Sequence, residues 1–179
     1  MKTTVISLFG GPGSGKTTVS LGVSYELKKR EINAELVREY VKKLAWQGIV
    51  PKKLDQLYIS GQQSNEEYIL YNKVKYIVTD CPLLQGPFYD IKYNNLNTTK
   101  NSVDLFLKNS NDITRLNFFV QRNKKYIKEG RFCSEESAKK TDEELKLYLK
   151  NNNIEYIQLN GTIGEQVEQV INNILSKED

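Results

Sequence analysis

A glycine-rich stretch at residues 10–17 carries the most specific chemistry in the sequence. Its letters, GGPGSGKT, fit the pattern G-x-x-x-x-G-K-[ST], in which glycines let backbone N–H groups curl around a phosphate. An apolar run at residues 5–9 precedes it, and a helix-forming segment at residues 18–30 follows. The amino end of such a helix presents free N–H groups to the same anion. The stretch therefore predicts that the protein binds a nucleoside triphosphate.

Each position of this loop has an expected role. Lys16 is predicted to reach the β- and γ-phosphates as a binding and catalytic group, and the Thr17 hydroxyl is predicted to ligate Mg²⁺. The residues expected to contact the nucleotide are Gly11, Gly13, Ser14, Gly15, Lys16, Thr17 and Thr18. ATP and Mg²⁺ are accordingly the expected cofactors.

Two carboxylates follow predicted strands and are candidates for catalysis. Asp80 ends the apolar run at residues 75–80, where P-loop proteins place the aspartate that helps to hold Mg²⁺; a turn or helix cap is the alternative. Glu39 follows the run at residues 34–38 and could take a proton from an attacking hydroxyl, or could simply stand in a first helical turn. Because the chain has no histidine, acid–base chemistry falls to carboxylates, lysines or tyrosines.

A basic loop at residues 122–133 comes after the predicted strand at residues 116–121. It resembles the lid of small kinases, so Arg122 and Arg131 are expected to close over the transferring phosphoryl group, exclude water and neutralise charge. An exposed basic loop without this role is the alternative. Arg38 is a candidate for binding a substrate phosphate as a bidentate donor, unless it forms a salt bridge.

The elements that position these residues alternate between strands and helices. Strands are predicted at residues 4–9, 34–38, 75–80, 116–121 and 154–159, and helices at residues 15–30, 40–47, 52–71, 100–109, 134–150 and 163–175. Residues 83–97 are predicted to be a loop with one helical turn. This alternation indicates a single three-layer α/β/α domain with a five-stranded parallel sheet, spanning residues 1–179. Ligands of such sheets lie at the carboxyl ends of the strands, beside the glycine loop.

Composition limits the class of protein. The chain has 179 residues, of which 39% are hydrophobic and 27% charged, and no apolar run approaches the ~20 residues that cross a bilayer. Cys81 and Cys133 lack metal-site spacing and fit a reducing cytoplasm. The net charge of +4 suits a small anionic ligand, and it makes nucleic acid a less expected partner. Composition leaves the oligomeric state open.

Four segments, at residues 9–18, 36–40, 77–83 and 116–120, together resemble a known family. It is the family of small P-loop, AAA-domain ATPase/kinase proteins of the phage type, similar to ribosylnicotinamide kinase and to nucleoside and nucleotide kinase domains. The resemblance implies an ATP- and Mg²⁺-dependent phosphotransferase with the P-loop kinase fold. The segment CP that follows Asp80 departs from the Asp-Arg pair of thymidylate kinases, which disfavours a thymidylate acceptor.

The same resemblance implies that the region between the second and third strands carries the phosphoryl acceptor. Gln62 is the substrate-binding candidate there. Further candidates in or near this region are Gln63, Trp46, Tyr58, Phe88, Tyr89 and Tyr93. The turn at residues 160–162 stands where P-loop kinases often pass backbone beside adenine, although a plain turn explains it equally well.

Three functions remain in competition. The leading hypothesis is a kinase that moves the γ-phosphoryl group of ATP to a hydroxyl or phosphate of a small nucleoside, nucleotide or ribosyl-pyridine. One alternative is a polynucleotide 5′-hydroxyl kinase, which needs a basic channel and a steep salt dependence. Another is a nucleotide-dependent ATPase that acts on a protein partner. The sequence also leaves open which of Glu39 and Asp80 is the base.

Overall fold

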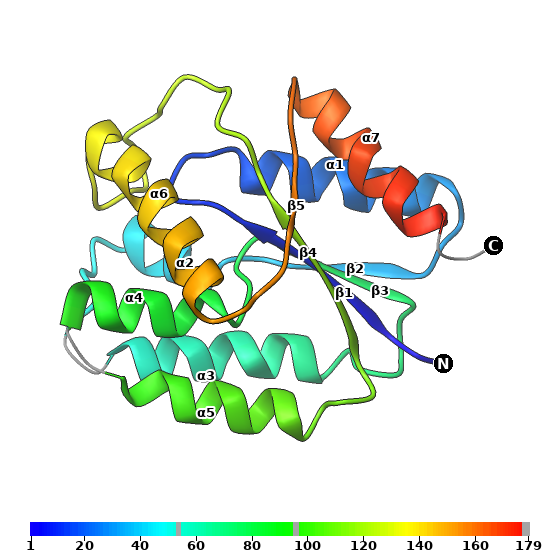
Figure 1. Cartoon of the computed structure of the whole chain (residues 1–179), viewed down its shortest axis with the longest axis horizontal. Coiled ribbons are helices and arrows are strands. Elements are labelled where there is room, and N and C mark those ends of the chain that lie inside the picture. Colours follow the sequence, from blue (N-terminus) through cyan, green and yellow to red (C-terminus); the bar gives the residue numbers. More distant parts are fainter. Residues whose placement is uncertain (53–54, 95–96, 177–179) are drawn as a thin grey trace.

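The computed structural model describes residues 1–52, 55–94 and 97–176. Among them, five parallel strands form one sheet in the order β2-β3-β1-β4-β5 (Figure 1). The strands are β1 (Thr4–Phe9), β2 (Ala34–Val37), β3 (Tyr76–Thr79), β4 (Thr114–Phe119) and β5 (Ile157–Gln158). The helices are α1 (Lys16–Lys29), α2 (Val41–Trp46), α3 (Asp55–Tyr68), α4 (Gln85–Asn94), α5 (Thr98–Lys108), α6 (Glu135–Asn151) and α7 (Ile163–Leu175).

Helices cover both faces of the sheet, which confirms the predicted three-layer α/β/α architecture. The helices α1 and α7 pack together over one face, and α3, α4, α5 and α6 lie over the other (Figure 1). Ile6 and Leu8 of β1 join the core beneath α1 and α7, whereas Val5 and Phe9 face the opposite helices. Burial on both faces explains why this strand reads as a continuous apolar run.

The register of the sheet gathers the candidate residues at one rim. Thr79 of β3 is in register with Ser7 of β1 and with Val37 of β2. The chain therefore leaves these three parallel strands at the same edge. Glu39 and Asp80 come directly after two of them, beside the glycine loop that follows β1.

The prediction of a loop at residues 83–97 is wrong over most of its length, because Gln85–Asn94 form the helix α4. Pro87 stands in its first turn, where a missing N–H removes no helical hydrogen bond. The buried carboxylate of Asp90 accepts a hydrogen bond from the N–H of Thr99 (3.0 Å) and so ties α4 to the start of α5. Tertiary contacts thus form a helix where composition indicates a loop.

Other predicted boundaries differ less. The strand β4 begins and ends two residues earlier than predicted, and β5 contains two residues because it pairs with β4 at two positions. Residues 53–54 of the predicted third helix and residues 95–96 of the predicted loop lie outside the described residues. Within the part of the chain that is described, no helix combines the length and apolar character that crossing a membrane requires.

Candidate active site

The P-loop, residues 10–17, curls at the amino end of α1. Gly13 and Gly15 have φ angles of 72° and 110°, in the left-handed region that favours glycine. Gly15 is the N-cap of α1 and has no side chain that could accept from the first N–H groups of the helix. The N–H of Thr18 donates to the carbonyl oxygen of Gly15 (2.9 Å), whereas those of Lys16 and Thr17 donate to no described residue and are available to an anion. The backbone of the loop therefore has the curled conformation that a phosphate cradle requires.

Lys16 brings a buried positive charge to this cradle. Lys16 is 7% exposed, and its ammonium donates hydrogen bonds to the carbonyl oxygens of Gly10 (2.7 Å) and Gly11 (3.1 Å). An ammonium has three donors, and the third has no partner among the described residues. The buried hydroxyl of Ser14 also has no hydrogen-bond partner among them. The unpaired donor of Lys16, a residue that lines the cavity described below, fits the oxygen-rich phosphate tail of a nucleotide.

Asp80 joins the ends of two strands to α1. Its Oδ2 accepts a hydrogen bond from the Thr17 hydroxyl (2.5 Å), and its Oδ1 accepts one from the N–H of Glu39 (2.9 Å). The residue is 2% exposed. Hydroxyl and carboxylate oxygens are ligands that Mg²⁺ prefers. Thr17 and Asp80 therefore offer a donor set that would suit this ion.

Glu39 differs from Asp80 in its surroundings. It lines the cavity described below, and its carboxylate accepts no hydrogen bond from any described residue. Burial raises the pKa of the Glu39 carboxyl above its ordinary value; the ammonium of Lys16 opposes this rise, and the charge of Asp80 adds to it. A carboxylate with free oxygens and a raised pKa is suited to accept a proton.

A cavity of about 960 Å³ lies between the P-loop, the segments 39–52 and 56–63, the segment 81–93 and the segment 124–137. Lys16, Thr17 and Glu39 line it together. This volume lies within the usual range for small-molecule sites. Its lining includes seven of the predicted residues, Gly13, Gly15, Lys16, Thr17, Thr18, Glu39 and Arg131, but not Gly11, Ser14 or Asp80.

The predicted lid, residues 122–133, folds over the P-loop. A Cβ atom on Gly13 would lie 2.9 Å from the ring of Tyr126 and 3.2 Å from Nε of Arg131. The guanidinium of Arg131 lies over the Tyr126 ring, 5.3 Å from its centroid, and lines the cavity. Gly130 approaches α2 so closely that a Cβ there would lie 3.0 Å from the indole of Trp46. The lid therefore contacts both the P-loop and α2.

Two predicted arginines lie outside the cavity lining. Arg122, at the start of the lid, forms an ion pair with Asp142 of α6 (Nε–Oδ2 2.8 Å). Arg38 is exposed to solvent. Of the two arginines expected to act at the transferring phosphoryl group, only Arg131 is placed at the cavity.

Gln62 also lies outside the lining, whereas its neighbour Gln63 is 2% exposed and forms part of it. The Oε1 of Gln63 accepts a hydrogen bond from the N–H of Tyr40 (3.2 Å), and its Nε2 has no partner among the described residues. The spacing of Ile59, Gln63 and Glu67, all buried, is that of one helix face. This periodicity is the sequence signal that distinguishes Gln63 from Gln62.

Aromatic residues line the cavity from α4. Tyr89 and Tyr93 stack with their ring centroids 5.7 Å apart and their planes 3° apart. The other aromatic candidates, Trp46, Tyr58 and Phe88, do not line it. Cys81 also lines the cavity, and burial raises the pKa of its thiol well above its ordinary value.

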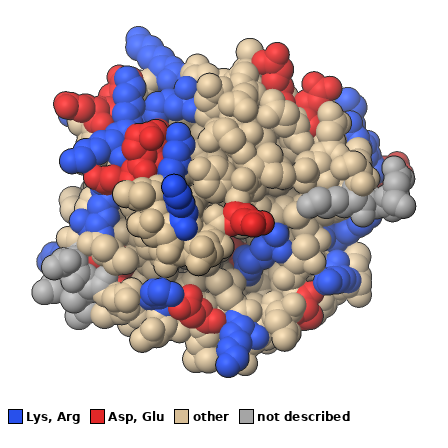
Figure 2. All heavy atoms as spheres, in the orientation of Figure 1, with Lys and Arg blue, Asp and Glu red and all other residues tan. Residues whose placement is uncertain are grey.

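The cavity is strongly basic. Its cationic lining residues are Lys16, Lys42, Lys52, Lys124, Lys125 and Arg131. Glu39 is the one carboxylate among its described lining residues. Such a charge balance suits anionic ligands. Figure 2 shows that lysines and arginines are otherwise spread over the visible face together with acidic residues.

A second hollow, of about 560 Å³, adjoins the start of α7. Gly161, Thr162 and Ile163 line it, together with Lys124 of the lid. A Cβ on Gly15 would lie 3.2 Å from Cδ1 of Ile163, so the hollow adjoins the P-loop. The turn at residues 160–162 is therefore near the P-loop. The sequence makes this turn a candidate for passing beside the adenine ring.

Comparison with known proteins places this geometry in a family. A family model described as "AAA domain" matches residues 5–166. No curated protein matches the chain. Among solved structures, a deoxyadenosine kinase from M. mycoides with dCMP and dCDP bound has a TM-score of 0.62 at 18% identity, covering 96% of this chain and 99% of that one.

A second similar fold is an APS kinase of Mycobacterium tuberculosis. A mutant of this enzyme matches with a TM-score of 0.57 at 14% identity, covering 98% of this chain and 99% of that one. The same enzyme in complex with AMPPNP and APS matches with a TM-score of 0.57 at 12% identity, covering 97% and 98%. These likenesses establish the P-loop kinase fold.

Proposed function

The chain belongs to the AAA-domain family of P-loop proteins, and we propose that it transfers the γ-phosphoryl group of ATP to a small acceptor. One observation carries this proposal. The phosphate cradle, the Glu39 carboxylate and the lid residue Arg131 line the same cavity. Phosphoryl transfer depends mainly on positioning and electrostatic stabilisation, and these groups supply both.

The donor phosphates would lie in the P-loop. The backbone N–H groups at the start of α1 and the third donor of Lys16 would hold their oxygens. Thr17 and Asp80 would hold Mg²⁺, and the bound ion would neutralise charge on the β- and γ-oxygens. The second hollow, beside Gly161, would take the base of the nucleotide. Its proximity to Gly15 supports this arrangement.

The transfer step assigns different roles to the two carboxylates. The acceptor hydroxyl oxygen bonds to the γ-phosphorus, the bond from that phosphorus to the bridging oxygen of ADP breaks, and the hydroxyl proton passes to Glu39. Both oxygens of Asp80 already accept hydrogen bonds, whereas those of Glu39 accept none from the described residues. This difference supports Glu39 as the base and Asp80 as the metal-associated carboxylate. Arg131 would neutralise charge on the transferring group.

The acceptor would carry a negative charge as well as a hydroxyl. Lys42 and Lys52 line the cavity from the segment that follows β2, outside the P-loop and the lid. A ribosyl-pyridinium is a cation and would be repelled by them, whereas a nucleotide with a free hydroxyl would be attracted. Gln63 Nε2 and the tyrosines of α4 could contact its base.

The experiment is an acceptor panel with labelled ATP and Mg²⁺. It contains nucleosides, nucleoside 5′- and 3′-monophosphates, a ribosyl-pyridinium and a 5′-hydroxyl oligonucleotide, and Lys16→Ala is the inactive control. We expect label to appear on a mononucleotide that has a free hydroxyl, and chelation of Mg²⁺ to abolish the transfer. If ATP binds and no member of the panel is labelled, the kinase assignment fails. Label on the oligonucleotide alone would favour the polynucleotide alternative.

A further inference from the structure

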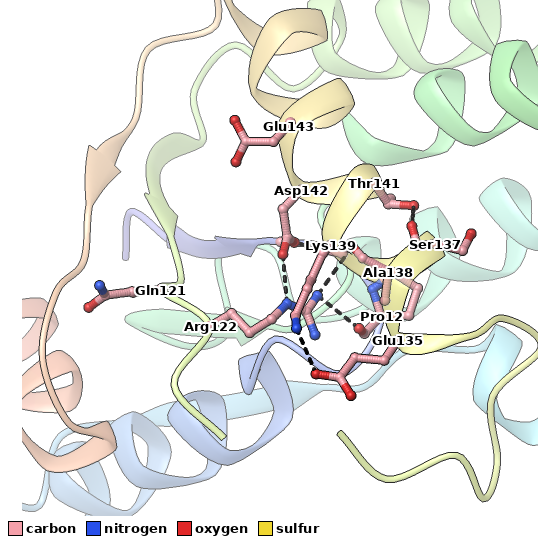
Figure 3. A network of polar contacts seen from close by, with 12 residues as sticks. Pro12, Gln121, Arg122, Glu135, Ser137, Ala138, Lys139, Thr141, Asp142 and Glu143 are labelled. Carbon is pink, nitrogen blue, oxygen red and sulfur yellow. Dashed lines mark hydrogen bonds and ion pairs between the residues drawn. The ribbon is translucent and has the colours of Figure 1, made fainter. Parts of the chain in front are cut away.

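A polar network joins the P-loop to α6, and the transfer step described above does not use it (Figure 3). The N–H of Gly11 donates to Oδ1 of Asp142 (2.5 Å), and Oδ2 of Asp142 accepts from Nε of Arg122 (2.8 Å). The Nη2 group of Arg122 donates to the carbonyl oxygens of Pro12 (3.0 Å) and Ala138 (3.3 Å). The N–H of Gly11 and the C=O of Pro12 are thus both held by this one ion pair.

The backbone angles of Gly11 do not require glycine, because it is not among the residues with positive φ. The reason for glycine at this position is steric. A Cβ on Gly11 would lie 2.8 Å from the carbonyl oxygen of Ala138 and 2.8 Å from Oδ1 of Asp142. The backbone of α6 therefore touches the P-loop directly. This close contact and the ion pair occur at the same point of the loop.

The network is buried, and its burial argues against a simple stabilising role. The side chains of Arg122 and Asp142 are 12% and 11% exposed. Removing two charges from water costs about as much free energy as their attraction returns, so a buried ion pair is weak evidence for stability. We therefore look for the role of the Arg122–Asp142 ion pair in the position that it gives to the P-loop backbone.

We infer that Asp142 is a positioning residue for the phosphate cradle, acting through the Gly11 amide and through Arg122. The inference rests on the proposed nucleotide-binding function. With the Gly11–Pro12 segment held at both ends, the following amides and Lys16 keep their places before a nucleotide arrives. Because Arg122 begins the lid and α6 follows it, the P-loop also fixes both ends of the lid.

The test compares the MgATP dissociation constants of wild type and four variants by calorimetry, at a temperature where each is folded by circular dichroism. Asp142→Ala removes both acceptors, and Asp142→Asn retains one oxygen for the Gly11 amide. Glu67→Gln is the matched control, because Glu67 forms another buried ion pair, with Arg115 (3.0 Å), and does not line the cavity. Groups that orient the contacts of a bound metal change its affinity by about 10–100-fold when removed, and we expect a similar loss for Asp142→Ala.

The expected order of MgATP affinity is wild type, then Asp142→Asn, then Asp142→Ala, with Glu67→Gln equal to wild type. Gly11→Ala, which separates α6 from the loop without changing a charge, should weaken binding as Asp142→Ala does. If the Asp142 variants lose thermal stability but bind MgATP as Glu67→Gln does, the inference is wrong and the network is only structural. If wild type itself does not bind MgATP, the proposed function fails first.

Discussion

Replacing Glu39 by glutamine tests the assignment of the base. Glutamine has the same shape and keeps the backbone N–H that donates to Asp80, so the rim of the sheet should be unchanged. The substitution removes the negative charge of this side chain and, with it, its ability to accept a proton. A positioned general base contributes about 10²–10⁴-fold, and kcat should fall by that factor while the affinity for MgATP stays near wild type.

The raised pKa of Glu39 predicts two effects of increasing pH: the catalytic rate should rise, and the stability of the folded protein should fall. The base works only when ionised, so the rate should rise with pH through a pKa above the ordinary glutamate value, and Glu39→Gln should lack this limb. The folded protein binds this proton more tightly than the unfolded chain. Stability from this group is therefore present at low pH and is lost as the pH rises through the folded pKa. At neutral pH, Glu39→Gln should raise stability by about 1 kcal/mol, or about 2–4 °C in Tm.

The assay is kcat/KM against pH for both proteins with the acceptor found in the panel, because this ratio reports the pKa values of the free enzyme; thermal unfolding at neutral pH accompanies it. A variant that is more stable and much slower would match the structure. Wild-type kcat in Glu39→Gln, or an acid limb that survives the substitution, would refute the role of Glu39. Such a result would favour an acceptor that attacks through a phosphate oxygen, since this needs no base.

Three further predictions follow from the lid and the core. Arg131→Ala should lower kcat by about 10³-fold or more with a smaller change in the KM for ATP, measured by steady-state kinetics. Gly13→Ala should weaken MgATP binding in calorimetry, because the new methyl meets the Tyr126 ring at 2.9 Å on a backbone with φ of 72°. Gly22→Ala should destabilise the fold by about 1–3 kcal/mol in denaturant unfolding, because its methyl would lie 2.6 Å from Val167 of α7; the MgATP affinity of the folded variant should not change.

Local signals explain which parts of the fold could be predicted from the sequence. The P-loop is a contiguous motif whose flanks confirm it, and β1 is an apolar run long enough to be distinguished from a turn. The helix α7 has the predicted bounds, Ile163–Leu175, because Thr162 and Glu165 form a capping box at its start. In each case the residues that determine the element lie within it or beside it.

Other features depend on contacts between distant segments. The helix α4 contains Gly86 and Pro87 and reads as a loop, yet its buried side joins the core and the cap of α5. The strand order of the sheet has no local signal either. The position of Gln63 rather than Gln62 at the cavity is different, because helical periodicity contains the information that separates the two residues.

The two lid arginines show how a distant partner decides a role. Both are basic residues in one loop, and nothing near them in the sequence separates a phosphate contact from an ion pair. Asp142 makes the distinction: it engages Arg122 and holds it against the P-loop, while Arg131 lies over Tyr126 at the cavity. One arginine therefore belongs to the part of the lid that is fixed to the P-loop, and the other to the part that lines the cavity. It follows that the contribution of Arg131 should depend on lid closure, whereas that of Arg122 should already be present in the cradle before any nucleotide binds.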